Sequence, residues 1–141
     1  MGIYLNPNNE NFTEAVRSKI YVDKTMMIKV LNRFMETANK YVCVSRPRRF
    51  GKTIAGNMLS AYYSKGCDSR QLFAPYRISR EECFETYLNK LNVIKIDMNS
   101  EYQNARDKDR LLDALQDKII DEFSAQFLGL AFSHEESGGD C

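Results

Sequence analysis

The chain has 141 residues, of which 43% are hydrophobic and 28% are charged, and its formal net charge is +1. This size and balance are typical of one globular domain with a modest core. A net charge so close to zero gives no overall attraction to nucleic acid or acidic lipid. The first ten residues lack the basic start and apolar stretch of a signal peptide, and no apolar run approaches the roughly 20 residues that span a bilayer. We therefore expect a soluble, cytoplasmic protein with no membrane partner.

The cysteines do not indicate a metal site. The chain has four of them, at positions 43, 67, 83 and 141, with no C-x-x-C pair, and its one histidine is His134. A zinc site is therefore not expected. This usage suits a reducing compartment, where free cysteines behave as small hydrophobic residues.

The apolar pattern predicts alternating helices and strands. Residues 9–17 and 24–38 have apolar positions at helical spacing, and the apolar run 41–44 predicts a strand. A helix follows over 54–64, beginning near Lys52. After a turn centred on Gly66, we expect a helix over 80–90, a second strand over 92–98 and a long amphipathic helix over 107–129. This order is α/β, and short strands with helical crossovers imply a parallel sheet.

The segment between the first strand and its following helix is the most informative part of the chain. Residues 46–53 read Arg-Pro-Arg-Arg-Phe-Gly-Lys-Thr, and the ending Gly-Lys-Thr is typical of a phosphate-binding loop, whose backbone N–H groups surround phosphates. Lys52 would reach the β and γ phosphate oxygens, and the Thr53 hydroxyl would bind Mg²⁺. Arg46 stands where the usual pattern has glycine and Pro47 donates no N–H, so the loop must enter its turn by a different route.

This loop, with the segments 21–25 and 58–63, resembles the predicted AAA-ATPase family over residues 1 to about 130. The resemblance implies ATP and Mg²⁺ as ligands and ATPase activity in the intact protein. Many members carry a PD-(D/E)XK nuclease-like domain further on, through which nucleic acid would be a partner. The residues expected to bind nucleotide are Arg48, Arg49, Phe50, Gly51, Lys52, Thr53, Ile54 and Asp23, with Thr53 as the metal ligand.

The resemblance also predicts the domain organisation. We expect a partial P-loop NTPase fold of three layers over residues 1–132, with a short parallel sheet between helices, and a polar, disordered tail over 133–141. The acidic Walker B strand of the family lies further along than this sequence extends, so we interpret the chain as a truncated portion that binds nucleotide with little or no hydrolysis. We assign no catalytic residue. A sheet with few strands would leave an unpaired edge, through which the chain could self-associate.

Two acidic residues have alternative interpretations. Asp23 either lies beside the nucleotide base, together with Val22 and Lys24, or caps the helix that follows it. Asp97 closes an apolar strand as a Walker B acid would, but the residues after it lack a second carboxylate. We therefore interpret Asp97 as a cap at a strand end or a solvated loop residue.

The basic loop allows a second function. Arg46, Arg48 and Arg49 could contact the phosphates of a nucleic acid, which makes the alternative a nucleic-acid-binding module. Binding through several phosphate contacts weakens steeply with salt, whereas a nucleotide site with Mg²⁺ should depend mainly on the metal.

Overall fold

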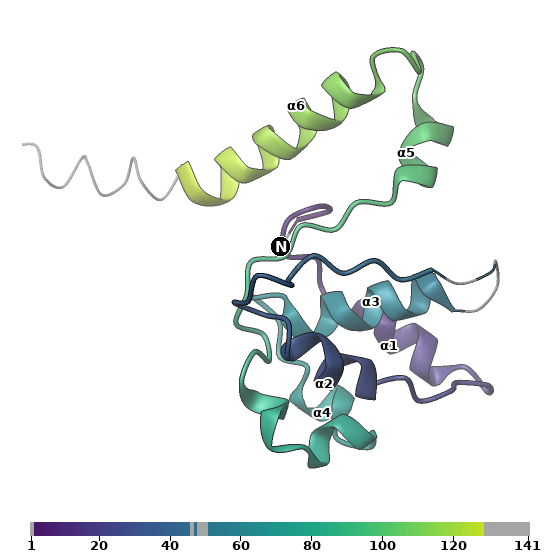
Figure 1. The fold of residues 1–141 in the computed structure, drawn as a ribbon. Helices are drawn as coiled ribbons and strands as arrows, with labels where there is room; N and C mark the ends of the chain where they lie inside the picture. Colours follow the sequence, from purple (N-terminus) through teal and green to yellow (C-terminus); the bar gives the residue numbers. More distant parts are fainter. Residues whose placement is uncertain (1, 46, 48–50, 129–141) are drawn as a thin grey trace, which may run out of the picture.

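The computed structural model describes residues 2–45, 47 and 51–128. In these residues the fold is helical (Figure 1). The α-helices are α1 (Glu10–Arg17), α2 (Met26–Asn32), α3 (Lys52–Tyr63), α4 (Arg70–Phe73), α5 (Met98–Asn104) and α6 (Leu111–Phe123). Two short 3₁₀ turns, η1 (Arg77–Arg80) and η2 (Glu82–Glu85), follow α4, and the π-helical turn η3 (Ser124–Leu128) continues α6. No helix in the described part is long and apolar enough to cross a membrane.

The predicted α/β fold of three layers with a parallel sheet is wrong for the described residues. They contain no strand, and their β-pairing is limited to two isolated bridges, Leu5 with Ile94 and Ser64 with Leu91. The domain limits 1–132 and 133–141 stay a prediction, since residues 129–141 lie outside the described part.

The first predicted strand, 41–44, has no pairing strand in the described part. It makes no backbone–backbone hydrogen bond there. Tyr41, Val42 and Val44 are 86%, 46% and 49% exposed. A strand forms only where a second segment satisfies its N–H and C=O groups, so an apolar pattern alone did not make one here. Self-association through an unpaired sheet edge stays a prediction, although the described residues form no sheet.

The second predicted strand, 92–98, is replaced by a single bridge and a helix. Lys95 donates its N–H to the Tyr4 carbonyl at 2.9 Å, beside the antiparallel bridge of Leu5 with Ile94. At Asp97 the chain turns into α5, because the carboxylate accepts hydrogen bonds from the backbone N–H groups of Asn99 and Ser100. This is a helix N-cap, which ends the extended segment.

The helix predictions succeed where the apolar spacing is local and regular. The helices predicted at 9–17 and 54–64 are confirmed as α1 and α3. The helix expected over 24–38 is shorter, since α2 covers only Met26–Asn32. The prediction of a helix over 80–90 is wrong. Residues Glu82–Glu85 form the 3₁₀ turn η2, and Asn89 has a positive φ of 53°, which an α-helix does not allow. The last predicted helix begins at Leu111 instead of 107.

The core surrounds the C-terminal half of α3. Its buried residues are Phe12, Ile28, Met58, Ala61, Tyr62, Tyr63, Phe73, Ile78, Phe84 and Leu88. The Tyr62 hydroxyl donates to the Phe84 carbonyl at 2.6 Å, and the Tyr63 hydroxyl donates to Asn32 Oδ1 at 2.6 Å. A buried phenol needs such a partner, so these two bonds fix α3 against η2 and α2.

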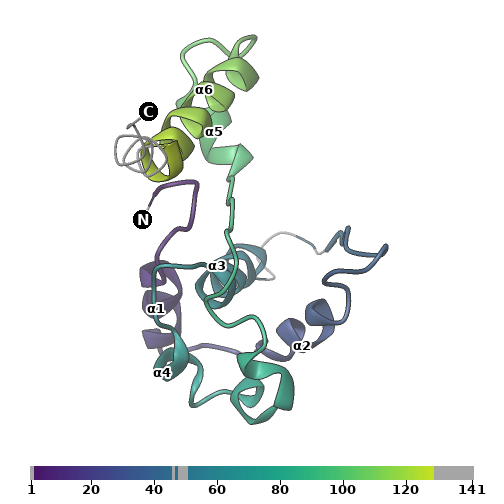
Figure 2. The same ribbon diagram turned by 90° about the vertical axis from the view of Figure 1, so that its left-hand side faces the viewer.

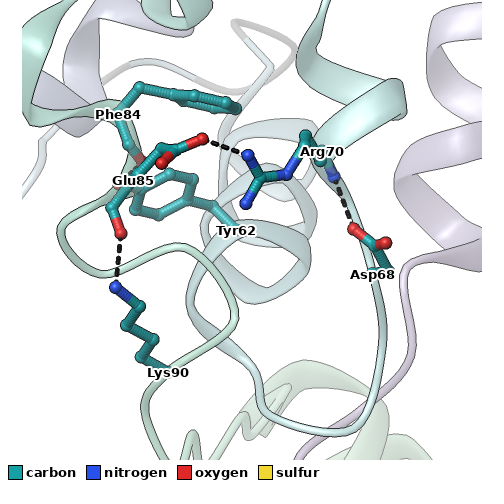
Figure 3. A network of polar contacts seen from close by, with 6 residues as sticks. All are labelled: Tyr62, Asp68, Arg70, Phe84, Glu85 and Lys90. Carbon is teal, nitrogen blue, oxygen red and sulfur yellow. Dashed lines mark hydrogen bonds and ion pairs between the residues drawn. The ribbon is translucent and has the colours of Figure 1, made fainter.

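Polar contacts border this core where it meets the protein surface (Figure 3). Arg70 forms an ion pair with Glu85 beside Tyr62 and Phe84, and Lys90 Nζ donates to the Glu85 carbonyl at 2.8 Å. The Arg70 N–H donates to Asp68 Oδ1 at 3.1 Å. Both partners of the ion pair are largely exposed, so it orients α4 and η2 more than it stabilises them.

The N-terminal segment joins α5 and α6 to the rest of the fold. The Tyr4 hydroxyl donates to Glu101 Oε1 on α5 at 2.7 Å, while the Tyr4 N–H donates to Glu122 on α6 at 3.0 Å. Figures 1 and 2 show α5 and α6 as an arm that projects from the body formed by α1–α4. The arm is thus held by hydrogen bonds to residues near the start of the chain.

Asn89 provides a test of how α3 is terminated. Its side-chain amide donates to the Ala61 and Ser64 carbonyls at 3.0 and 2.9 Å, and its Oδ1 accepts from the Ser69 N–H at 2.9 Å. These bonds satisfy carbonyls at the C-terminal end of α3 that lack a partner within the helix. We expect Asn89→Ala to lower the free energy of unfolding by about 2–4 kcal/mol, from the lost bonds and the left-handed backbone.

Urea denaturation followed by circular dichroism measures this loss. Asn89→Gly is the control, because it loses the same hydrogen bonds but accepts a positive φ. It should be about 1 kcal/mol more stable than Asn89→Ala. Equal stability of Asn89→Ala and the unaltered chain would show that the amide does not support α3.

Candidate phosphate-binding site

Gly51 has the backbone conformation that delivers the chain into α3. Its φ and ψ are 79° and 24°, in the left-handed region, and its carbonyl accepts the first helical hydrogen bond from the Ala55 N–H at 2.9 Å. A Cβ at this position would lie 2.9 Å from Nζ of Lys24. Both the dihedral angles and this close approach favour glycine.

The N-terminus of α3 can receive an anion. No side chain of a described residue caps it, and Lys52, Thr53 and Ile54 are exposed. The first N–H groups of a helix have no partner within the helix, and they form its positive dipole end. Since α3 has 12 residues, its dipole is developed, and the arrangement is of the kind that binds phosphate or carboxylate groups.

Two lysines line the same groove at this helix end. Lys24 and Lys52 both contribute to an open groove of about 800 Å³, together with Gly51. The remaining lining is mostly apolar and comes from α2, the turn after it, α3 and the segment 42–44; it consists of Met27, Val30, Leu31, Phe34, Val42, Val44, Ala55, Gly56 and Leu59. The groove is therefore mostly apolar, and the side chains of Lys24 and Lys52 form its positively charged part.

A second, smaller pocket of about 270 Å³ shares Lys24, Gly51 and Ala55 with the groove. Its other lining residues are Ile20, Tyr21, Val22, Ile54 and Met58. It is thus largely apolar and lies beside the N-terminal turn of α3. A flat apolar ring attached to an anion would find both kinds of surface here.

Tyr21 holds the wall of the smaller pocket in place. Its ring packs edge-on against Phe12 on α1 at 5.8 Å and against Tyr76 at 5.3 Å between centroids. Burial, followed by the nearby charge of Asp23, raises the pKa of Tyr21 to about 12. The phenol is therefore neutral at physiological pH, and its position is set by aromatic packing.

Asp23 is engaged in a local turn and does not cap the helix that follows, because the N-cap of α2 is Thr25 and no side chain caps it. Its Oδ1 accepts from the Thr25 N–H at 2.9 Å and from the Thr25 hydroxyl at 2.6 Å, and its Oδ2 accepts from the Arg77 N–H at 3.1 Å. Partial burial alone would raise the pKa of Asp23, but the hydrogen bonds from Thr25 and Arg77 outweigh it and hold the pKa below 3.8. Asp23 lines neither cavity, whereas its neighbours Val22 and Lys24 do.

Asp97, by contrast, is engaged as a cap. It accepts from the Asn99 and Ser100 N–H groups at 3.1 and 3.2 Å and from the Ser100 hydroxyl at 2.9 Å, and these bonds, led by those from Ser100, lower its pKa. The interpretation of Asp97 as a cap holds, although it caps a helix and not a strand end. The described residues contain no group of three or more His, Cys, Asp or Glu side chains that could hold a metal ion.

The structure brings together part of the predicted site. Gly51, Lys52 and Ile54 line the two cavities, as does Lys24 from the preceding segment. Arg48, Arg49 and Phe50 lie outside the described residues, as does Arg46. Sequence reasoning missed Ile20, Tyr21, Ala55 and Met58. The spacing of Ile54 and Met58, four residues apart on one helix face, was the signal that could have indicated a shared wall.

The comparisons agree with the resemblance drawn from the sequence. The model of a family described as predicted AAA-ATPase matches residues 9–136. Neither the search of curated proteins nor the search of solved structures found a match. The match covers α1 to α6, including the loop that precedes α3, and it indicates an ATPase-type role. The chain belongs to the predicted AAA-ATPase family.

Proposed function

We propose that the chain binds ATP with Mg²⁺ at the N-terminus of α3. The observation that carries the proposal is the left-handed Gly51, which presents the uncapped N-terminal turn of α3 in a groove lined by two lysines. Helix N–H groups, a helix dipole and an ammonium group are the components that hold nucleotide phosphates. Lys52 then reaches the β and γ phosphates from the first turn of the helix.

The base has a place in the smaller pocket. Its apolar wall of Ile20, Val22 and Met58 adjoins Gly51, so a ligand with its phosphates at α3 can lay an aromatic ring against it. The two faces of the adenine ring are apolar, which suits a pocket whose lining side chains other than Lys24 and Tyr21 are apolar. The segment 20–24 would thereby contribute through Val22 and Lys24, whereas Asp23 lines neither cavity.

Mg²⁺ would be held by the Thr53 hydroxyl and the phosphate oxygens. This ion keeps several waters and takes one or two protein ligands in nucleotide sites, so one hydroxyl beside the phosphates suffices. We propose binding with little turnover by this chain, because both carboxylates considered for the site already accept hydrogen bonds from neighbouring groups of the chain. Asp23 accepts from Thr25 and Arg77, and Asp97 accepts from Ser100.

Lys52→Ala tests the phosphate contact. Calorimetric titration with Mg·ATP should show saturable binding to the unaltered chain and binding at least about ten-fold weaker to the variant, because a hydrogen bond to a charged group contributes about 1.5–3 kcal/mol. Lys65→Ala, an exposed lysine just after α3, is the matched control and should bind as the unaltered chain does. Phosphate release measured on the same samples should stay near background.

Retained ATP binding by Lys52→Ala would contradict the proposal. A parallel titration with a single-stranded oligonucleotide at two salt concentrations separates the alternative function. Oligonucleotide binding that falls steeply with salt, without ATP binding, would favour the nucleic-acid module.

Gly51→Ala tests the loop geometry. The left-handed backbone and the contact with Lys24 should make the variant about 1–2 kcal/mol less stable than the unaltered chain and weaken ATP binding with it. Gly56→Ala is the matched control, because a Cβ there meets no atom within 4 Å. In a helix interior that change should add about 0.5–1 kcal/mol to the free energy of unfolding. Thermal unfolding of both variants, with and without Mg·ATP, measures the effects.

Asp23→Asn separates the role of this carboxylate in the local turn from ligand binding. A carboxylate whose pKa is lowered by folding adds stability above its unfolded value of 3.8, and this contribution is lost as the pH falls through the lower folded pKa. The variant should therefore be less stable than the unaltered chain at neutral pH, and the difference should shrink in acid below pH 3.8. A difference that does not change with pH would exclude a stabilising role of the ionised carboxylate in this turn. Nucleotide affinity lost at full stability would indicate direct contact with the ligand.

A further inference from the structure

Helix α6 exposes an apolar face along its length. Leu112, Ile120 and Phe123 are 64%, 60% and 46% exposed, and their spacing of eight and three residues places them on one side of the helix. Phe127 lies on the same side, with its ring centroid 4.8 Å from that of Phe123. Figures 1 and 2 show α6 projecting away from α1–α4, so the body of the protein does not cover this face.

One flank of that face is already occupied. Leu115 is buried, Glu122 accepts from the Tyr4 N–H at 3.0 Å, and Gln126 Nε2 donates to the Leu5 carbonyl at 3.5 Å. The N-terminal segment therefore covers this flank. Lys118 also belongs to the occupied side, through its ion pair with Glu101 on α5 at 3.2 Å.

The open flank carries a row of aspartates. Asp113, Asp117 and Asp121 are exposed and follow each other at intervals of four residues, which aligns them along one side of α6. None of them forms an ion pair with another described residue. Like charges at this spacing disfavour a helix, so the row is unfavourable until cations face it.

We propose that this face of α6 binds a helical segment of another protein, whose apolar stripe is bordered by lysine or arginine. Leu112, Ile120 and the Phe123–Phe127 pair would provide the apolar contacts of a helix-to-helix interface. The three aspartates would face the basic border of the partner. Charge of opposite sign along such a border selects partner and orientation.

A second copy of this chain fits the face poorly. In an antiparallel pair of α6 helices the same flanks meet, so Asp113 and Asp117 would face the aspartates of the other copy. In a parallel pair the aspartates would face the flank that residues 2–5 already cover. The acidic row would also be repelled by an anionic lipid surface. The surface therefore favours a basic helix over these occupants.

Two synthetic helical peptides test the charge requirement. Both have the length of α6 with η3, about 18 residues, and the same leucine stripe, but one is bordered by lysines and the other by glutamates. In fluorescence anisotropy at low salt, the full chain should bind the lysine peptide roughly ten-fold or more tightly than the glutamate peptide. Equal binding of the two peptides, or binding of neither, would overturn the proposal.

Charge reversal provides the matched variants. The double variant Asp117→Lys, Asp121→Lys should prefer the glutamate peptide. The control Glu14→Lys, Glu82→Lys changes the net charge equally, at exposed residues of α1 and η2, and should keep the preference for lysine. Unchanged preference in the α6 variant, with its helix content confirmed by circular dichroism, would overturn the proposal.

The apolar contribution has its own pair of variants. Ile120→Ser should weaken binding of the lysine peptide, whereas Tyr41→Ser, at a hydrophobic residue that is 86% exposed and does not belong to α6, should leave it unchanged. Sedimentation of the chain alone tests whether a second copy of the chain binds to this face instead. Self-association that Ile120→Ser abolishes would assign the face to a second copy and overturn the proposal.

Discussion

The fold depends on how the C-terminal half of α3 is anchored. Tyr62 is fully buried and its hydroxyl donates to the Phe84 carbonyl, while Asn89 binds the carbonyls that end the helix. A helix rises about 1.5 Å per residue and is stiff over a few turns, so fixing Tyr62 also fixes the direction of α3 and the place of Lys52 about 15 Å away. The exposed first turn needs no core of its own. It can leave its N–H groups for a ligand because the other end supplies the stability.

Local signals in the sequence predicted the parts of the fold that local interactions stabilise. The apolar residues of α1 and of α3 recur at regular helical spacing within each segment, and the two helices contact each other. The pattern at 41–44 is equally apolar, but strand formation depends on a second segment, and pairing partners cannot be identified from one segment alone. Residues 92–98 contain two conflicting patterns, one that predicts a strand and one that predicts the start of a helix. The aspartate at 97 with serine at 100 forms a local N-cap, and that cap replaced the end of the predicted strand by α5.

The residues of the candidate site likewise fall into two groups, those that the sequence motif predicted and those that only the tertiary structure reveals. Gly51 and Lys52 were found because the loop motif requires a glycine turn and an ammonium group at fixed spacing, and Gly51 indeed has the positive φ that the turn requires. Ile20, Tyr21 and Met58 were missed because they meet only through tertiary packing, Tyr21 by its ring contacts with Phe12 and Tyr76. Asp23 illustrates an ambiguity of short motifs. An Asp-x-Thr sequence readily forms hydrogen bonds within itself, so its presence near a site does not assign the carboxylate to the ligand.

The net charge of +1 conceals an uneven distribution of charge, and this limits what composition can exclude. Lys24 and Lys52 line one groove at the start of α3, whereas three aspartates follow one side of α6 in a different part of the fold. At physiological salt, charges separated by more than about 8 Å are largely screened from one another. Each group of charges therefore acts on its own neighbourhood, and the sum over the chain describes neither. A near-neutral composition argues against non-specific attraction to a polyanion, but it remains compatible with one site that attracts anions and another that attracts cations.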